Sequence, residues 1–134
     1  LATRPWQHVL EPLSGYLVLA EKLYTQGQVF AEAFNFGLAE EDAKPVQWIV
    51  EQFTQHWGDG ADWHLDGGIH PHEAHYLKLD CSKARAVLGW SSRWNLGQAL
   101  QAIVTWHKAH NMNNSSQDMR ALCLQQINDY SKTI

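Results

Sequence analysis

The run RPWQHVLEPLSGYLVLAEKLY, residues 4–24, decides how the first part of the chain folds. Its WQHVL segment combines aromatic and β-branched side chains, which is typical of a short strand. Pro12 suits the first turn of a helix, because its missing N–H would have no partner there in any case. Leu13 and Leu17 recur at helical spacing, and Gly27 ends the pattern. We therefore expect a strand, a turn and an amphipathic helix.

A second strand is predicted at AEAFNFG, residues 31–37, where the two faces alternate until Gly37. We expect the strands containing Trp6–Val9 and Ala33–Phe36 to belong to one parallel arrangement. Short alternating runs near residues 62–80, separated by the turn-like GGIHPH, predict a smaller lobe.

Helical spacing and capping residues predict four further helices. The first follows EEDAKP, with Asp42 or an adjacent acid as its N-cap, and ends near Gly58. Asp80 is placed to cap SKARAVLGW, and Gly89 to end it. The others cover residues 96–110 and 118–130, separated by the polar linker NMNNSSQ.

Composition restricts the classes of protein to consider. The 134 residues are 45% hydrophobic and 18% charged, which fits one globular domain with a real core. A net charge of -4 without a dense Lys/Arg block argues against a nucleic-acid or membrane-surface partner. No apolar run approaches the roughly 20 residues of a membrane span. Cys81 and Cys123 lack CxxC spacing, so we expect free thiols in a cytoplasmic protein.

Motifs for chemistry are scarce. HPHEAH, residues 70–75, groups histidines with Glu73, but it lacks HExxH and Pro71 disfavours a helix, so no metal site is expected. The sequence has no glycine-rich dinucleotide loop, and none of its four tyrosines is followed four positions later by lysine. The residues therefore favour a binding part that does not itself bind a nicotinamide cofactor or carry out catalysis.

The cluster around Arg4 has two interpretations on the residues alone. Arg4, Trp6, Gln7 and His8 form either a binding edge for a charged ligand or a strand that ends against solvent. A guanidinium has the planar fork of donors that engages phosphate oxygens, but most single arginines are ordinary surface cations.

Three segments together resemble a known family. These are RPWQHVLEPLSGYL, AFNFG, and HEAHYLKLDCSKARAVLGWSSRWNLGQAL, which contains an Asp-x-x-Lys-Ala-x-x-x-Leu-Gly-Trp module. Over most of residues 4–107 the chain resembles the C-terminal part of bacterial CDP-glucose 4,6-dehydratases, which are extended short-chain dehydrogenases/reductases. The resemblance implies an α/β class, an α+β fragment in which a small mixed sheet with flanking helices forms the C-terminal portion of an extended Rossmann-type protein.

The resemblance also implies roles for particular residues. Arg4 matches the position of an arginine that, in relatives, contacts the diphosphate of the nucleotide sugar. Asn35 matches an asparagine that lies near the same nucleotide. His70 falls where many relatives have a second diphosphate-binding arginine, so either a pH-dependent contact from His70 or another cation would complete the clamp. Glu73 would accept hydrogen bonds from nucleotide hydroxyls. The remaining substrate-binding candidates, which fix the edge and touch the sugar, are Trp6, Gln7 and His8.

The implied activity is that of a cytoplasmic, homo-oligomeric lyase with tightly held NAD. It converts CDP-glucose to CDP-4-keto-6-deoxyglucose for deoxysugar biosynthesis of the O-antigen (lipopolysaccharide) type. Residues 1–110 would be the nucleotide-sugar-binding portion, with residues 1–37 packing on the Rossmann half, and residues 111–134 a polar linker and C-terminal helix. NAD and the catalytic residues would belong to a part of the parent enzyme that precedes Leu1, so this fragment alone would be inactive.

Two alternatives remain open from the sequence. In the first, the protein belongs to the same superfamily but is another nucleotide-sugar dehydratase or an epimerase. The other is a free-standing carbohydrate-binding or interaction module.

Overall fold

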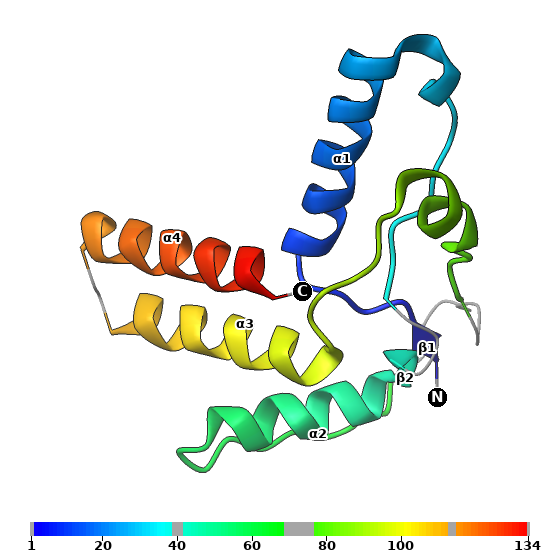
Figure 1. The fold of residues 1–134 in the computed structure, drawn as a ribbon. Helices are drawn as coiled ribbons and strands as arrows, with labels where there is room; N and C mark the ends of the chain where they lie inside the picture. Colours follow the sequence, from blue (N-terminus) through cyan, green and yellow to red (C-terminus); the bar gives the residue numbers. More distant parts are fainter. Residues whose placement is uncertain (1, 39–41, 69–76, 113–114, 134) are drawn as a thin grey trace.

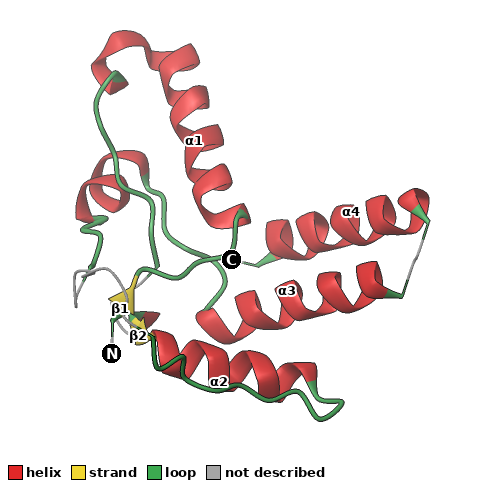
Figure 2. Ribbon diagram, turned by 180° about the vertical axis from the view of Figure 1, so that it is seen from behind, coloured by secondary structure: helices red, strands yellow, loops and turns green. Residues whose placement is uncertain are grey.

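The computed structural model describes residues 2–38, 42–68, 77–112 and 115–133, and most of these residues are helical (Figures 1 and 2). The four α-helices are α1 (Leu10–Gln26), α2 (Val46–Trp57), α3 (Leu96–Asn111) and α4 (Ser116–Lys132). Two shorter elements are the 3-10 helix η1 (Gly27–Phe30) and the π-helix η3 (Ala84–Leu88). None of the described helices combines the length and apolar character that a membrane span requires.

The helices form a layered bundle from which α1 projects. α3 contacts both α2 and α4, and the ribbon views place α3 between these two helices (Figures 1 and 2). One core cluster joins α2 to α3 through Leu38, Ile49, Leu96 and Leu100. A second cluster, which includes Phe36, Leu88 and Trp90, packs against α1. Between β1 and α1, Trp6 packs against the first cluster and the Gln7 side chain donates to the carbonyl of Phe36 in the second.

The sheet is smaller than the sequence pattern predicted. It consists of β1 (Thr3–Arg4) and β2 (Lys44–Pro45), two residues each, paired antiparallel. Its edges are extended by single backbone hydrogen bonds, from the Val46 N–H to the Ala2 carbonyl and from the Leu77 N–H to the Thr3 carbonyl.

The predicted parallel strands at Trp6–Val9 and Ala33–Phe36 were wrong, because neither segment forms a strand. Side chains fix the first segment instead: the Trp6 and Gln7 side chains donate to backbone carbonyls of other segments, and His8 is buried. β-Branched and aromatic residues indicate a half-buried segment rather than a strand as such, and here the half-buried segment is an irregular loop. The alternating runs predicted near residues 62–80 also contain no strand within residues 61–68 and 77–80; the residues between lie outside the described chain.

Most helix boundaries agree with the sequence signals. Gly27 ends α1, and Gly89 ends η3 with left-handed backbone angles of φ 68° and ψ 17°. The Asp80 carboxylate accepts from the Ser82 N–H at 2.8 Å, as a cap does. The predicted acidic cap of α2 was wrong: Pro45 is the N-cap residue, with no side-chain cap, because β2 runs directly into the helix.

α1 is the helix that the sequence predicted to be amphipathic, and it exposes an apolar stripe. Leu13, Leu17 and Leu23 are 46%, 71% and 36% exposed. The helix approaches the core at Gly15, where a Cβ atom would lie only 2.3 Å from the Phe36 ring. α1 is therefore anchored near its first half, and its leucine stripe has no cover within the described chain.

Candidate functional site

The two-residue ribbon places a second cation beside Arg4. Arg4 and Lys44 are directly paired across β1 and β2, so their side chains leave the same face of the ribbon. The Arg4 Nη1 donates to the Thr3 carbonyl at 3.0 Å, and the Lys44 Nζ lies 5.8 Å from the centroid of the Trp48 ring. Sequence reasoning missed Lys44, because a strand of two residues has no periodicity to reveal its partner.

The structure brings three of the predicted segments together. The loop between β1 and α1, which follows Arg4, is called the Arg4 loop. Its Gln7 Nε2 donates to the Phe36 carbonyl at 3.0 Å, which joins this loop to the segment holding Asn35. The Asn35 Nδ2 donates to the Asp80 carbonyl at 3.1 Å. His70 and Glu73 lie outside the described residues. The next described residue is Leu77, whose backbone N–H donates a hydrogen bond to the Thr3 carbonyl in β1.

Asp80, whose carbonyl accepts the Asn35 hydrogen bond, lines a small cavity of about 210 Å³. Its charged lining residues are Lys78, Asp80 and Arg85. Hydrogen bonds from Ser82 hold the pKa of the Asp80 carboxyl below its usual value, with a smaller contribution from Arg85. The cavity therefore combines two cations with one carboxylate. The sequence signal for it was present, since HYLKLDCSKAR concentrates basic residues around one aspartate.

Trp6 and Gln7 are half-buried anchors of the loop between β1 and α1. The Trp6 Nε1 donates to the Lys44 carbonyl at 3.2 Å, which ties the loop to β2. The other polar atom of the Gln7 amide, Oε1, is buried without a hydrogen-bond partner in the part of the chain that the structure describes.

His8 faces a different neighbourhood from Arg4. It is 7% exposed, its Nδ1 accepts from the Leu10 N–H at 3.3 Å, and its ring meets the Trp94 ring edge-on at 5.0 Å. Burial lowers the pKa of the His8 imidazole. His8 also lines a mostly apolar cavity of about 330 Å³ formed with α3 and α4 residues that include Trp106 and Cys123.

The described residues contain no group of three or more His, Cys, Asp or Glu side chains that could hold a metal ion. The polar groups of the candidate site are the cations Arg4, Lys44, Lys78 and Arg85, the Asn35 and Gln7 amides and the Asp80 carboxylate. Such a set binds and orients anionic groups.

Comparison with known proteins places this site in context. No protein-family model matches the chain. Among curated proteins, the chain is similar to a nucleotide-sugar dehydratase. This relative is the CDP-glucose 4,6-dehydratase of Salmonella typhimurium strain LT2, with 57% identity over 127 residues. The aligned residues are 95% of this chain and 34% of the relative, so the chain spans about a third of that protein's length.

The match confirms the resemblance inferred from three short segments and extends it. Because only 7 of the 134 residues (134 − 127) fall outside the alignment, the match must reach into α4. The sequence segments that carried the resemblance stopped near residue 107. The last helix is thus part of what this chain shares with the relative.

Proposed function

We propose that this chain is the nucleotide-sugar-binding part of an NAD-dependent CDP-glucose 4,6-dehydratase. The observation that carries the proposal is the 57% identity to a protein of that name over nearly the whole chain. The resemblance implies that the intact protein forms CDP-4-keto-6-deoxyglucose.

Arg4 is the principal diphosphate ligand in this proposal. Its guanidinium can engage two phosphate oxygens at once, and Lys44 on the paired strand adds a second positive charge on the same face. Lys78 and Arg85 add two cations to the cavity lined by Asp80, whose carbonyl holds Asn35, the proposed nucleotide contact.

The other predicted ligands keep their proposed roles. His70 would be the second cation of the diphosphate clamp and Glu73 the acceptor for nucleotide hydroxyls. Trp6, Gln7 and His8 would form the shell that fixes the Arg4 loop and borders the sugar. Their hydrogen bonds and burial support the fixing role directly.

NAD is assigned to another part of the intact protein. This sequence holds neither a glycine-rich strand-loop-helix nor a Tyr-x-x-x-Lys pair, so it lacks the usual means of binding the cofactor's diphosphate and of moving the first proton. NAD would supply hydride acceptance and return. The exposed stripe of α1 supports the same division, because a face with Leu13, Leu17 and Leu23 fits a covering Rossmann half.

Calorimetric titration of the intact protein with CDP-glucose and CDP tests the proposal. A charge-assisted hydrogen bond is worth about 1.5–3 kcal/mol, so Arg4→Ala should weaken binding roughly ten- to a hundredfold. Arg120→Ala, at an exposed position on α4, is the matched control and should leave affinity unchanged. Unchanged affinity in a folded Arg4→Ala protein would remove Arg4 from the site. Preference for a different nucleotide sugar would favour another dehydratase or an epimerase.

A further inference from the structure

A buried carboxylate lies just beyond the Arg4 loop, in the first turn of α1. Glu11 is completely buried. Its Oε1 accepts from the Trp94 N–H at 2.8 Å, and its Oε2 accepts from the Arg93 N–H at 3.1 Å and from the Tyr130 hydroxyl at 2.7 Å. Taking a carboxylate out of water is unfavourable unless several donors meet it, and these three donors do so.

The donors come from parts of the chain that are distant in sequence. Arg93 and Trp94 lie just ahead of α3, whereas Tyr130 belongs to the last turn of α4. The Tyr130 hydroxyl also lies 2.9 Å from the Ser14 Oγ, which accepts from the Trp90 Nε1 at 2.8 Å. Burial, together with the neighbouring Glu11, raises the pKa of Tyr130 to about 12, so the hydroxyl keeps its proton and can donate it.

This network reaches the Arg4 loop through His8. The Glu11 N–H donates to the His8 carbonyl at 3.0 Å. The His8 ring packs edge-on against Trp94, and the Trp94 ring packs edge-on against Tyr130 at 5.2 Å. One end of the loop is therefore held by the network, while Trp6 and Gln7 hold its middle through the Lys44 and Phe36 carbonyls.

We propose that Glu11 and Tyr130 are positioning residues, through which the last helix sets the geometry of the ligand edge at Arg4. The inference rests on the proposed nucleotide-sugar function and adds α4 to the parts of the chain that determine it. Its physical basis is that a bidentate phosphate contact depends on the orientation of the guanidinium, which follows the backbone of the residues around it. Neither residue need touch the ligand.

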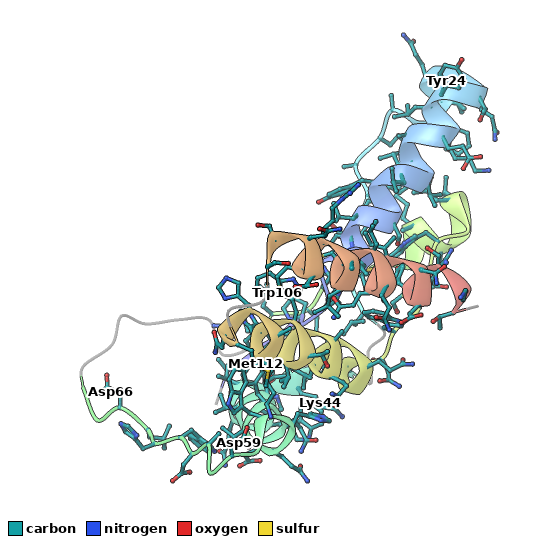
Figure 3. The ribbon with its side chains drawn as sticks, turned by 90° about the vertical axis from the view of Figure 1, so that its left-hand side faces the viewer. Tyr24, Lys44, Asp59, Asp66, Trp106 and Met112 are labelled. Atoms are coloured by element: carbon teal, nitrogen blue, oxygen red, sulfur yellow. The ribbon has the colours of Figure 1, made fainter. Side chains whose placement is uncertain are left out.

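Tyr130→Phe in the intact protein tests this role, because it removes the hydroxyl and keeps the aromatic ring. We expect the dissociation constant for CDP-glucose and the KM to rise about three- to tenfold, the size of one lost hydrogen bond, with kcat and NAD affinity unchanged. The nuclear magnetic resonance signals of the His8 ring should shift as well. Tyr24→Phe is the matched control: Tyr24 is 92% exposed, lies at the far end of α1 (Figure 3), and should leave every measurement unchanged.

A second pair of variants separates geometry from charge. Glu11→Gln keeps an oxygen for the backbone amides and offers its NH₂ group to the Tyr130 hydroxyl oxygen, so it should retain binding near the wild-type level. Glu11→Ala removes the side-chain acceptor of the Arg93 and Trp94 N–H groups and leaves the Tyr130 hydroxyl with Ser14 alone, so it should weaken binding at least as much as Tyr130→Phe. Where Glu11→Ala does not fold, Glu11→Gln and Tyr130→Phe still give the comparison.

The outcomes distinguish the two proposals. Wild-type protein that fails to bind CDP-glucose would overturn the proposed function. Wild-type protein that binds, with Tyr130→Phe folded and binding equally well, would overturn the positioning role alone. A Tyr130→Phe protein in which kcat, NAD affinity and CDP-glucose affinity all decline together would also overturn it, because that pattern indicates general destabilisation.

Discussion

α1 and α3 are helices of nearly equal length, 17 and 16 residues, in very different surroundings. α3 lies between α2 and α4 and buries Leu96, Ala99, Leu100 and Val104. The buried residues of α1 are Glu11 and Gly15, both near its start, while Leu13, Leu17 and Leu23 are exposed. Amphipathic sequence is common to both helices, but α1 packs only Val18 and Leu19 against the Phe36 cluster and leaves the stripe of Leu13, Leu17 and Leu23 exposed.

The difference shows how unevenly stability is distributed in this molecule. Most helical stability in proteins comes from packing an apolar face, so α3 is held along its length. α1 is held at its first half by the Glu11 hydrogen bonds and the Gly15 contact with Phe36. The exposed face of α1, with Leu13, Leu17 and Leu23, should therefore depend on whatever covers it in the intact protein.

The largest effect is expected at the centre of α3. Leu100 is 4% exposed and belongs to the α2/α3 core, so Leu100→Ala should lower the free energy of unfolding of the 134-residue chain by about 2–5 kcal/mol. Urea unfolding followed by circular dichroism gives the value. A loss below about 1 kcal/mol would show that α3 does not carry the packing assigned to it.

A somewhat smaller loss is expected where α1 meets the core. An added Cβ at Gly15 would lie 2.3 Å from the Phe36 Cδ1, so Gly15→Ala should destabilise the chain by about 1–3 kcal/mol through overpacking. This outcome opposes helix propensity, which alone favours alanine over glycine by about 1 kcal/mol. The control is Gly97→Ala in α3, where the nearest atom is 3.4 Å away. Stabilisation by Gly15→Ala would contradict the close approach.

Sequence signals located the helices well because those signals are local. Spacing and flanking glycines marked α1, α3 and the end of η3 without any knowledge of neighbours. The Asn95/Gln98 capping box that starts α3 was not among the predictions. The strands were misplaced because β1 pairs with a segment about forty residues away, and two-residue strands carry no period.

The site was only partly predictable for the same reason. Arg4 and Asn35 followed from a family resemblance, and they remain predictions. Lys44 became a candidate only through the strand register. Glu11 looks like an ordinary acid in the first turn of a helix, where solvent exposure is the usual outcome. Its burial depends on Tyr130, which lies 119 residues later in the sequence and which no local pattern connects to it.

His8 should make stability depend on pH at the anchored end of α1. Burial lowers its pKa in the folded chain below the ordinary 6.5, so the unfolded chain binds this proton more tightly. The stability that depends on neutral His8 is fully present above pH 6.5 and is lost as the pH falls through the folded pKa. Across this range the free energy of unfolding should change by at most about 1.4 kcal/mol per pH unit. Urea unfolding across this range should show a shallower slope in His8→Asn.

The control for this prediction is His64→Asn, because His64 lies in an exposed loop. That variant should keep the wild-type pH dependence. An unchanged slope in His8→Asn would mean that other groups carry the dependence.

The smallest effect is expected on the outer face of α1. Leu17 is 71% exposed, so Leu17→Ala should change the unfolding free energy of the 134-residue chain by no more than about 0.5 kcal/mol. In the intact protein the same substitution should cost several times more, because a leucine covered by another part of the chain loses about 1.5–3 kcal/mol of burial when it is truncated. Thermal unfolding of both proteins, with and without the substitution, measures the difference. Equal small effects in the two proteins would mean that the α1 stripe stays uncovered, and the comparison between α1 and α3 would then hold for the intact protein as well.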